Sequence, residues 1–252
     1  MNGNPWWLAI AVDARGGVAG ATCIEESDPW RVAGESVGEI VAEALRKHGG
    51  MKPVAATLVH PRWMGADTLG EALRDIDRAG VPERLVRATA DAEVLMASKT
   101  STVSDMVRDG LDPGARGRLV IVDASSGRVY GVDGAASPVG EGSDVAANDV
   151  ADAADVAAEV SARLREHGGA GADVALVGLP RDTRAMGEAL ASVVAEPTRY
   201  SLLDLARGAL APESIRTERH RAAPNSRSAM VRGKRPGRTG VLGGLRKLFG
   251  RG

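Results

Sequence analysis

Residues 118–132 read Arg-Leu-Val-Ile-Val-Asp-Ala-Ser-Ser-Gly-Arg-Val-Tyr-Gly-Val, which is an apolar run, a polar turn and a second apolar run. Short β-branched runs bounded by turn residues are typical of buried strands, and two such runs joined by a tight turn predict a hairpin. The same arrangement occurs near the N-terminus, where residues 7–13 lead through a glycine turn into residues 19–24. In both hairpins an aspartate, Asp13 or Asp123, stands where the first strand ends. We therefore expect one structural unit to be used twice, once in each half of the chain.

The segments after each hairpin alternate between amphipathic helices and short apolar strands. In the first half we expect helices that begin at Ser36, at Asp67 and at Asp91, and strands over 53–60 and 84–88. In the second half we expect helices over 149–167 and 183–194, a strand over 173–178, and a last helix that begins at a capping box, Ser201 to Asp204. This alternation predicts two similar α/β lobes that face one another.

The composition limits the cellular setting. Of 252 residues, 44% are apolar and only 3% aromatic, so Ala, Val and Leu must build the core. The single cysteine, Cys23, excludes an intramolecular disulfide and suits a reducing compartment. No apolar stretch is long enough for a membrane span, and the N-terminus lacks the features of a secretion signal. We expect a cytoplasmic protein.

The net charge of −1 conceals a division between body and tail. From Ser214 onward there are eleven Lys/Arg and one acid, a net charge of +10, which leaves −11 on the rest of the chain. The Arg, Ser, Pro and Gly of this tail bury too little apolar surface to fold. We therefore expect a disordered linker over 213–239, and we expect the tail to seek anionic surfaces.

The last residues, 240–252, have the pattern of a short amphipathic helix. Its apolar stripe and flanking cations are Val241, Leu242, Leu245, Arg246, Lys247, Leu248 and Phe249. A basic amphipathic segment after a flexible linker predicts binding to an anionic membrane surface, here the inner face of the cell membrane. It resembles the C-terminal membrane-targeting helices of bacterial division proteins. The alternatives are docking on a protein partner and nucleic-acid binding; without interleaved aromatic residues we expect no specific nucleic-acid partner.

The order of elements over about residues 6–211 resembles the actin and heat-shock-chaperone (DnaK-like) ATPase superfamily. The resemblance implies an actin-like (ribonuclease H-like) ATPase fold, with one lobe over 1–112 and a second over 113–212. It also implies that the two hairpin turns bind nucleotide phosphates and that the segment 173–190 binds adenosine. The implied nucleotide-binding residues are Asp13, Gly16, Gly17, Asp123, Ser125, Ser126, Gly127 and Gly178, and Asp13 and Asp123 would hold magnesium through its waters.

Several positions depart from the superfamily pattern. Arg15 stands where the first loop has glycine, the second turn lacks the Asp-x-Gly-x-Gly pattern, and Pro180 follows Gly178 in the adenosine turn. Residues 88–91 replace a Glu-Pro pair, so we expect the water-positioning carboxylate to be absent. The chain is also too short for the outer subdomains. These departures predict a minimal, degenerate pseudo-ATPase that binds Mg-ATP weakly at most, and ordinary turn-residue roles for Asp13 and Asp123 are the alternative to a metal site.

The expected function is that of a membrane-associated scaffold or adaptor, which binds the membrane through its C-terminal helix and a protein partner that the sequence does not identify. The alternative, from another class, is a membrane-associated, ATP-binding chaperone-like ATPase or nucleotide switch. Residues 57–63 (Thr-Leu-Val-His-Pro-Arg-Trp) resemble the actinobacterial members of the superfamily linked to type VII secretion.

Overall fold

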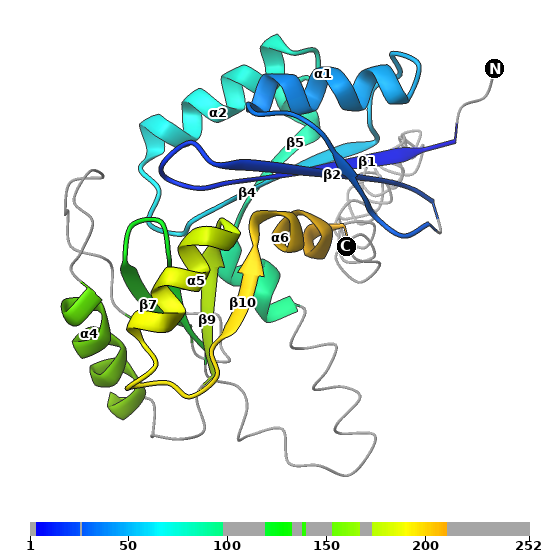
Figure 1. Cartoon of the computed structure of the whole chain (residues 1–252). Coiled ribbons are helices and arrows are strands. Elements are labelled where there is room, and N and C mark those ends of the chain that lie inside the picture. The colour runs from blue at the N-terminus through cyan, green and yellow to red at the C-terminus, as the bar shows by residue number, and fades with distance from the viewer. Residues whose placement is uncertain are drawn as a thin grey trace, which may run out of the picture. The chain divides into compact units, whose positions relative to one another are not determined.

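The computed structural model describes residues 4–25, 27–97, 119–132, 138–139, 153–166 and 173–210. These residues form two five-stranded sheets with helices packed against them (Figure 1). Both sheets belong to one compact unit. No helix in the described part of the chain is long and apolar enough to cross a membrane.

The first sheet is built around the N-terminal hairpin. Its strands are β1 (Trp6–Val12), β2 (Val18–Ile24), β3 (Trp30–Val32), β4 (Ala55–His60) and β5 (Val86–Ala90). The order across the sheet is β3-β2-β1-β4-β5. Strand β2 runs antiparallel to both β1 and β3, whereas β4 and β5 continue the sheet in parallel with β1. The hairpin pairs Trp6 with Ile24 and Val12 with Val18, as the apolar pattern predicts.

The second sheet repeats this topology. Its strands are β6 (Leu119–Asp123), β7 (Arg128–Val132), β8 (Pro138–Val139), β9 (Asp173–Gly178) and β10 (Thr198–Ser201). They lie in the order β10-β9-β6-β7-β8, with an antiparallel hairpin followed by two parallel strands. Each strand thus has a counterpart in the first sheet, β6 for β1 and β9 for β4. The predicted fold class, two similar α/β lobes, is confirmed.

Within the described residues, three apolar cores hold the helices to the sheets. Helices α1 (Val37–Lys47) and α2 (Ala66–Arg78) pack with the first sheet around one core, and a second core joins the second sheet to α4 (Ala153–Glu166) and α5 (Pro180–Ala189). The third core contains residues of both sheets, the helical residues 91–97, and α6 (Leu202–Ala209). Although α6 follows the second sheet in sequence, it packs against β1 and β2 of the first, as Figure 1 shows.

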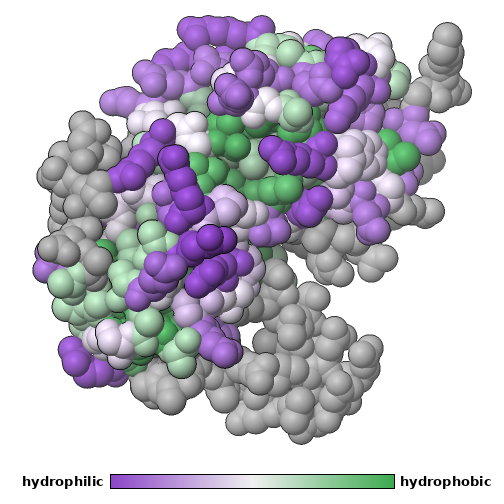
Figure 2. All heavy atoms as spheres, viewed as in Figure 1, coloured by the Kyte–Doolittle hydropathy of each residue, from purple (hydrophilic) through white to green (hydrophobic). Residues whose placement is uncertain are grey.

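The surface follows the same division between buried and exposed faces. Figure 2 shows hydrophilic side chains over much of the outward-facing surface of α1 and α2. On α1 the buried residues are Val37, Ile40, Val41 and Ala44, which are spaced at helical intervals.

Helix α1 is capped at its N-terminus by Ser36, whose Oγ accepts a hydrogen bond from the Glu39 amide. The Glu39 carboxylate accepts from the amide of Glu35 and not from that of Ser36.

Some element boundaries differ from the sequence prediction. Helix α2 is capped by Gly65, and Asp67 lies within its first turn. Helix α5 begins at Pro180, three residues before the predicted start, because proline fits the first helical position. The short strands β3, β8 and β10 were not predicted. The predicted lobe boundary at residue 112, the linker over 213–239 and the helix over 240–252 lie outside the described residues.

Candidate functional site at the hairpin turns

The first hairpin turn is folded around the carboxylate of Asp13. One carboxylate oxygen, Oδ1, accepts hydrogen bonds from the amides of Arg15 (2.8 Å) and Gly17 (2.7 Å). The turn is closed by Asp13 N, which donates to Gly17 O, and by Gly16 N, which donates to Asp13 O. Gly16 has φ of +80°, in the left-handed region that favours glycine. The sequence Asp-Ala-Arg-Gly-Gly therefore forms a self-contained aspartate turn.

The side chain of Asp13 is nearly enclosed. It is 5% exposed, and a Cβ at Gly17 would stand 2.3 Å from its second oxygen, Oδ2. Burial raises the pKa of Asp13; the amides of Gly17 and Arg15 oppose that effect, and the charges of Asp123 and Asp182 add to it. Oδ2 accepts no hydrogen bond from the described residues, whereas Arg15 and Gly16 at the tip of the turn are exposed.

The second hairpin turn satisfies Asp123 more completely. Oδ1 of Asp123 accepts from the amide (2.9 Å) and the hydroxyl (2.7 Å) of Ser125, and Oδ2 accepts from the hydroxyl of Ser126 (2.9 Å). A carboxylate has about four lone-pair directions, so three of them are already used. Asp123, Ser125 and Ser126 are 2%, 1% and 4% exposed, respectively, and every residue from 123 to 127 is buried.

Whether these turns can bind a phosphate depends on how many of their backbone amides lack an acceptor within the protein. An anion cradle needs successive amide N–H groups that point outward without a partner. In the first turn the amides of residues 15, 16 and 17 all donate to Asp13. In the second turn the amides of residues 124, 125, 127 and 128 donate to Val177 O, Asp123 Oδ1, Asp123 O and Ser126 Oγ. The turns in this conformation do not fit a nucleotide phosphate.

The end of β5 carries a carboxylate that sequence reasoning missed. Asp91 is 1% exposed; its Oδ1 accepts from the amide of Ala92 (2.6 Å), and its Oδ2 accepts from the hydroxyl of Tyr130, on β7 of the other sheet. Burial raises the pKa of Asp91 to about 7, and the charge of Asp123 adds to this rise. The hydrogen bonds from Tyr130 and Ala92 have the opposite effect and lower it. We expected no water-positioning carboxylate in residues 88–91, and the one carboxylate in that stretch, Asp91, is bonded to Ala92 and Tyr130.

The Asp91 carboxylate joins elements that lie far apart in the sequence. The amide of Arg62, after β4, stabilises its charged form, and Tyr130 lies 39 residues away along the chain. The pKa of the Tyr130 hydroxyl is raised by burial and by the charge of Asp91, so it remains a donor at neutral pH. Because both Asp91 oxygens are already bonded, the group connects the two lobes and is not free to orient a water molecule.

A second connection between the lobes involves Trp63 and Arg128. The Arg128 guanidinium carbon lies 4.1 Å from the centroid of the Trp63 ring, a cation–π contact. Trp63 follows β4 in the first lobe and Arg128 begins β7 in the second. The loop after β4 therefore contacts the start of β7, next to the buried second turn.

The predicted adenosine turn packs against the second hairpin turn. Gly178 has φ of +150°, and a Cβ there would lie 3.4 Å from the Cβ of Ala124. Ala124 N also donates to Val177 O (2.8 Å). Gly178 thus permits close contact between β9 and the turn after β6, and it contributes to packing within the second lobe.

The structure brings some of the predicted site residues together. Asp13 and Asp123 lie near enough for their charges to interact, and Gly178 lies beside the second turn. No group of three or more His, Cys, Asp or Glu in the described ranges is arranged to hold a metal ion, which leaves the predicted pair Asp13 and Asp123 untested. The predicted membrane-binding residues, 241–249, lie outside the described part.

The repeated strand order defines the architecture of the chain: two equivalent α/β lobes, each with an antiparallel hairpin followed by two parallel strands. Solved structures that are similar to the chain include the following two. One is a Bacteroides thetaiotaomicron protein with actin-like ATPase fold and unknown function, at 7% identity and TM-score 0.43, covering 79% of this chain and 91% of that one. The other is a ROK family protein from Streptococcus pneumoniae in complex with sucrose, at 11% identity and TM-score 0.36, covering 85% and 99%. No family model and no curated protein matches the chain.

Proposed function

We propose that the protein is a membrane-associated scaffold or adaptor, built on a degenerate domain of the actin/chaperone superfamily that does not hydrolyse ATP. One observation carries the first half of this proposal: most amide donors of both hairpin turns, at residues 15–17, 124, 125, 127 and 128, have acceptors within the protein. A phosphate would have to displace several short hydrogen bonds, each of which contributes about 1 kcal/mol or more when it involves a charged group.

The buried second turn supports the same conclusion. Ser125 and Ser126 direct their hydroxyls at Asp123, so neither offers a donor to a phosphate oxygen. In a working site of this kind the carboxylate would face metal-bound waters. Here its neighbours are the residues of its own turn and of β9. The aspartate therefore acts as a structural turn residue.

The membrane part of the proposal is supported by the sequence of the tail. A cationic linker followed by an apolar stripe at helical spacing has the composition of segments that fold on anionic bilayers. We propose that residues 240–252 place the protein at the inner face of the cell membrane, where the two-lobe body presents a surface to a protein partner. Residues 57–63 support a relation to the secretion-associated members of the superfamily.

The second candidate function is a membrane-associated nucleotide switch. It is favoured by the first turn, where the exposed tip and the unbonded Oδ2 of Asp13 leave one carboxylate oxygen for a ligand. Binding there would require only one of the two turns to rearrange.

Liposome co-sedimentation tests the membrane proposal. We expect the full chain to pellet with vesicles that contain phosphatidylglycerol and to remain in the supernatant with pure phosphatidylcholine. A variant without residues 240–252 should lose most of this binding. The charge reversal Arg184→Glu, at an exposed residue of α5, is a control for the loss of a positive charge elsewhere on the protein. Equal pelleting of the full and shortened chains would contradict the proposal.

A further inference from the structure

One end of the first lobe carries exposed apolar side chains. Met51 and Val54, 41% and 52% exposed, are the large hydrophobic residues that the described part leaves open to solvent. They flank Lys52 and the buried Pro53 in the segment between α1 and β4. Val54 N donates to Trp6 O (2.8 Å), which holds the segment against the start of β1.

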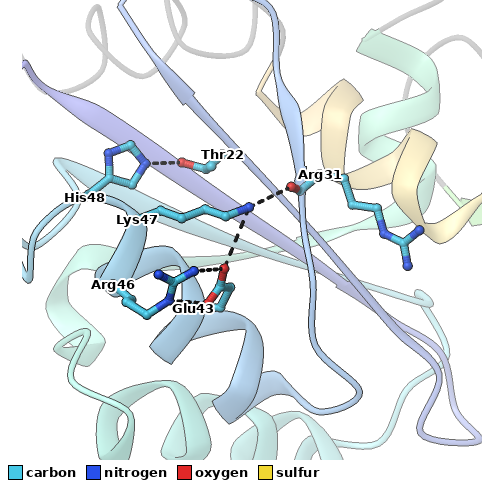
Figure 3. A network of polar contacts seen from close by, with 6 residues as sticks. All are labelled: Thr22, Arg31, Glu43, Arg46, Lys47 and His48. Atoms are coloured by element: carbon cyan, nitrogen blue, oxygen red, sulfur yellow. Dashed lines mark hydrogen bonds and ion pairs between the residues drawn. The ribbon is translucent and has the colours of Figure 1, made fainter.

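A stack of aromatic rings lies beside this segment. The His48 ring stacks on Trp6 with 4.0 Å between centroids and 6° between planes, and Trp30 lies 6.1 Å from the same ring. His48 Nε2 is 3.1 Å from Thr22 Oγ1, and because that hydroxyl donates to Trp7 O, the histidine donates to it (Figure 3). Trp30 is half-exposed at the same end of the sheet, opposite Thr22. We call Trp30, Met51, Lys52 and Val54 the lobe-end patch.

Cations border the lobe-end patch. Lys52 and Arg31 are exposed, and neither side chain forms an ion pair within the described part of the chain; the Arg31 guanidinium points away from the network in Figure 3. Lys47 contacts Arg31 O (3.5 Å) and Glu43, and Glu43 also holds Arg46 (2.7 Å). Such a combination of exposed apolar tips and lysine or arginine suits the interfacial zone of an anionic bilayer, in which the charged ends stay at the headgroups.

Two exposed acids, Glu25 and Asp28, lie between β2 and β3 at this end. They limit the net positive charge near the patch, so charge alone would give only weak attraction to anionic lipid. The apolar tips are therefore expected to supply most of the affinity, with the cations selecting anionic over neutral headgroups.

The last described residues of the chain lie at the same end of the first lobe. Helix α6 begins after Ser201, which pairs with Gly178 beside the second hairpin turn, and it packs against β1 and β2. In Figure 1 it runs from there toward the end at which β1 begins. The described chain thus ends at Leu210 on the side of the lobe-end patch, and the 42 residues that follow include the predicted membrane helix.

We propose that the lobe-end patch is a second membrane contact, which rests on an anionic bilayer when the C-terminal segment binds. This proposal rests on the membrane association given under the proposed function. Two linked contacts on one surface reinforce each other, because the first raises the effective concentration of the second. They would also fix the orientation of the body, with the hairpin turns at the opposite end of the first sheet, away from the lipid.

Tryptophan quenching separates the two contacts. All four tryptophans, Trp6, Trp7, Trp30 and Trp63, belong to the body, and residues 211–252 contain none. Vesicles of phosphatidylglycerol and brominated phosphatidylcholine therefore quench emission only when the body approaches the acyl chains, whereas pelleting reports either contact. The variants are full-length Met51→Ser/Val54→Ser and Lys52→Glu, with Arg184→Glu on the second lobe as the matched charge reversal. Thermal melting checks that each is folded.

We expect the wild type and Arg184→Glu to pellet and to be quenched. The double variant should lose the quenching and partition roughly tenfold more weakly, since two partly exposed apolar side chains no longer insert. Pelleting without quenching, or quenching that survives in the double variant, would overturn the proposal and leave the tail-mediated binding intact. Absence of pelleting would overturn both. A change in emission without lipid on deletion of residues 240–252 would show that the tail covers the patch, and would also overturn the proposal.

Discussion

Replacement of Asp91 by asparagine should change how the stability of the protein depends on pH. The carboxyl group is almost fully buried and its pKa is raised to about 7, from an ordinary value of 3.8. Between these two values the folded protein holds a proton that the unfolded chain has released, so the free energy of unfolding falls as the pH rises. A shift of about three units corresponds to about 4 kcal/mol when the pH exceeds both values.

Guanidinium unfolding of the wild type and of Asp91→Asn, followed from pH 4.5 to 8.5, measures this effect. The amide cannot ionise and still accepts one hydrogen bond, so the stability of the variant relative to the wild type should increase with pH up to about 7 and then level off. The replacement Asp28→Asn, at an exposed residue, is the control for removal of a surface carboxylate. In Tyr130→Phe the Asp91 carboxylate loses a hydrogen-bond donor, so its pKa should rise further. The decrease in the free energy of unfolding with pH should then continue to a higher pH than in the wild type. A constant difference between Asp91→Asn and the wild type would refute the assignment of the buried carboxyl.

Three further changes test individual elements. Gly17→Ala places a Cβ 2.3 Å from Asp13 Oδ2 and should lower the free energy of unfolding by about 1–3 kcal/mol. Gly70→Ala, in open space on α2, should raise it by about 0.5–1 kcal/mol. Equal effects of the two replacements in denaturant titrations would contradict the close packing of Gly17 against Asp13. Ser201→Ala removes the capping box of α6 and should cost about 1 kcal/mol in the same assay; no loss would show that the cap is dispensable. The Cys23 thiol is buried, and burial raises its pKa to about 11, so it should react with a disulfide reagent only on unfolding; rapid labelling of the native protein would disprove its burial.

The two hairpins were predictable because their signal is local. The apolar runs, the aspartate that starts each turn and the glycine that ends it lie within fewer than twenty residues of sequence in each hairpin. The capping box at Ser201 was predictable for the same reason. The edge strands β3, β8 and β10 were missed because they are short: β3 has three residues and β10 four. Exposed edges also carry polar side chains with no alternating pattern.

The hydrogen bonds of the candidate site were harder to predict from the sequence than its location. The turn residues were identified correctly, but their hydrogen bonds depend on side-chain rotamers that a pattern does not specify. Ser125 and Ser126 were candidates for contacts to a nucleotide, and in the structure their hydroxyls bond to Asp123. Asp91 was predicted to begin a helix, but its bond to Tyr130 was not predictable because Tyr130 lies on a distant strand. The available signal was an aspartate at the junction of a strand and a helix, which is also a common capping position.

Calorimetric titration of the full chain with Mg-ATP tests most directly the claim that the hairpin turns hold their own aspartates and not a nucleotide. We predict no saturable heat, and no increase in the melting temperature with nucleotide in excess, because most amides of both turns already have acceptors within the protein. Saturable one-to-one binding, accompanied by thermal stabilisation that is lost in Asp13→Ala, would contradict this account and would establish the nucleotide switch in its place.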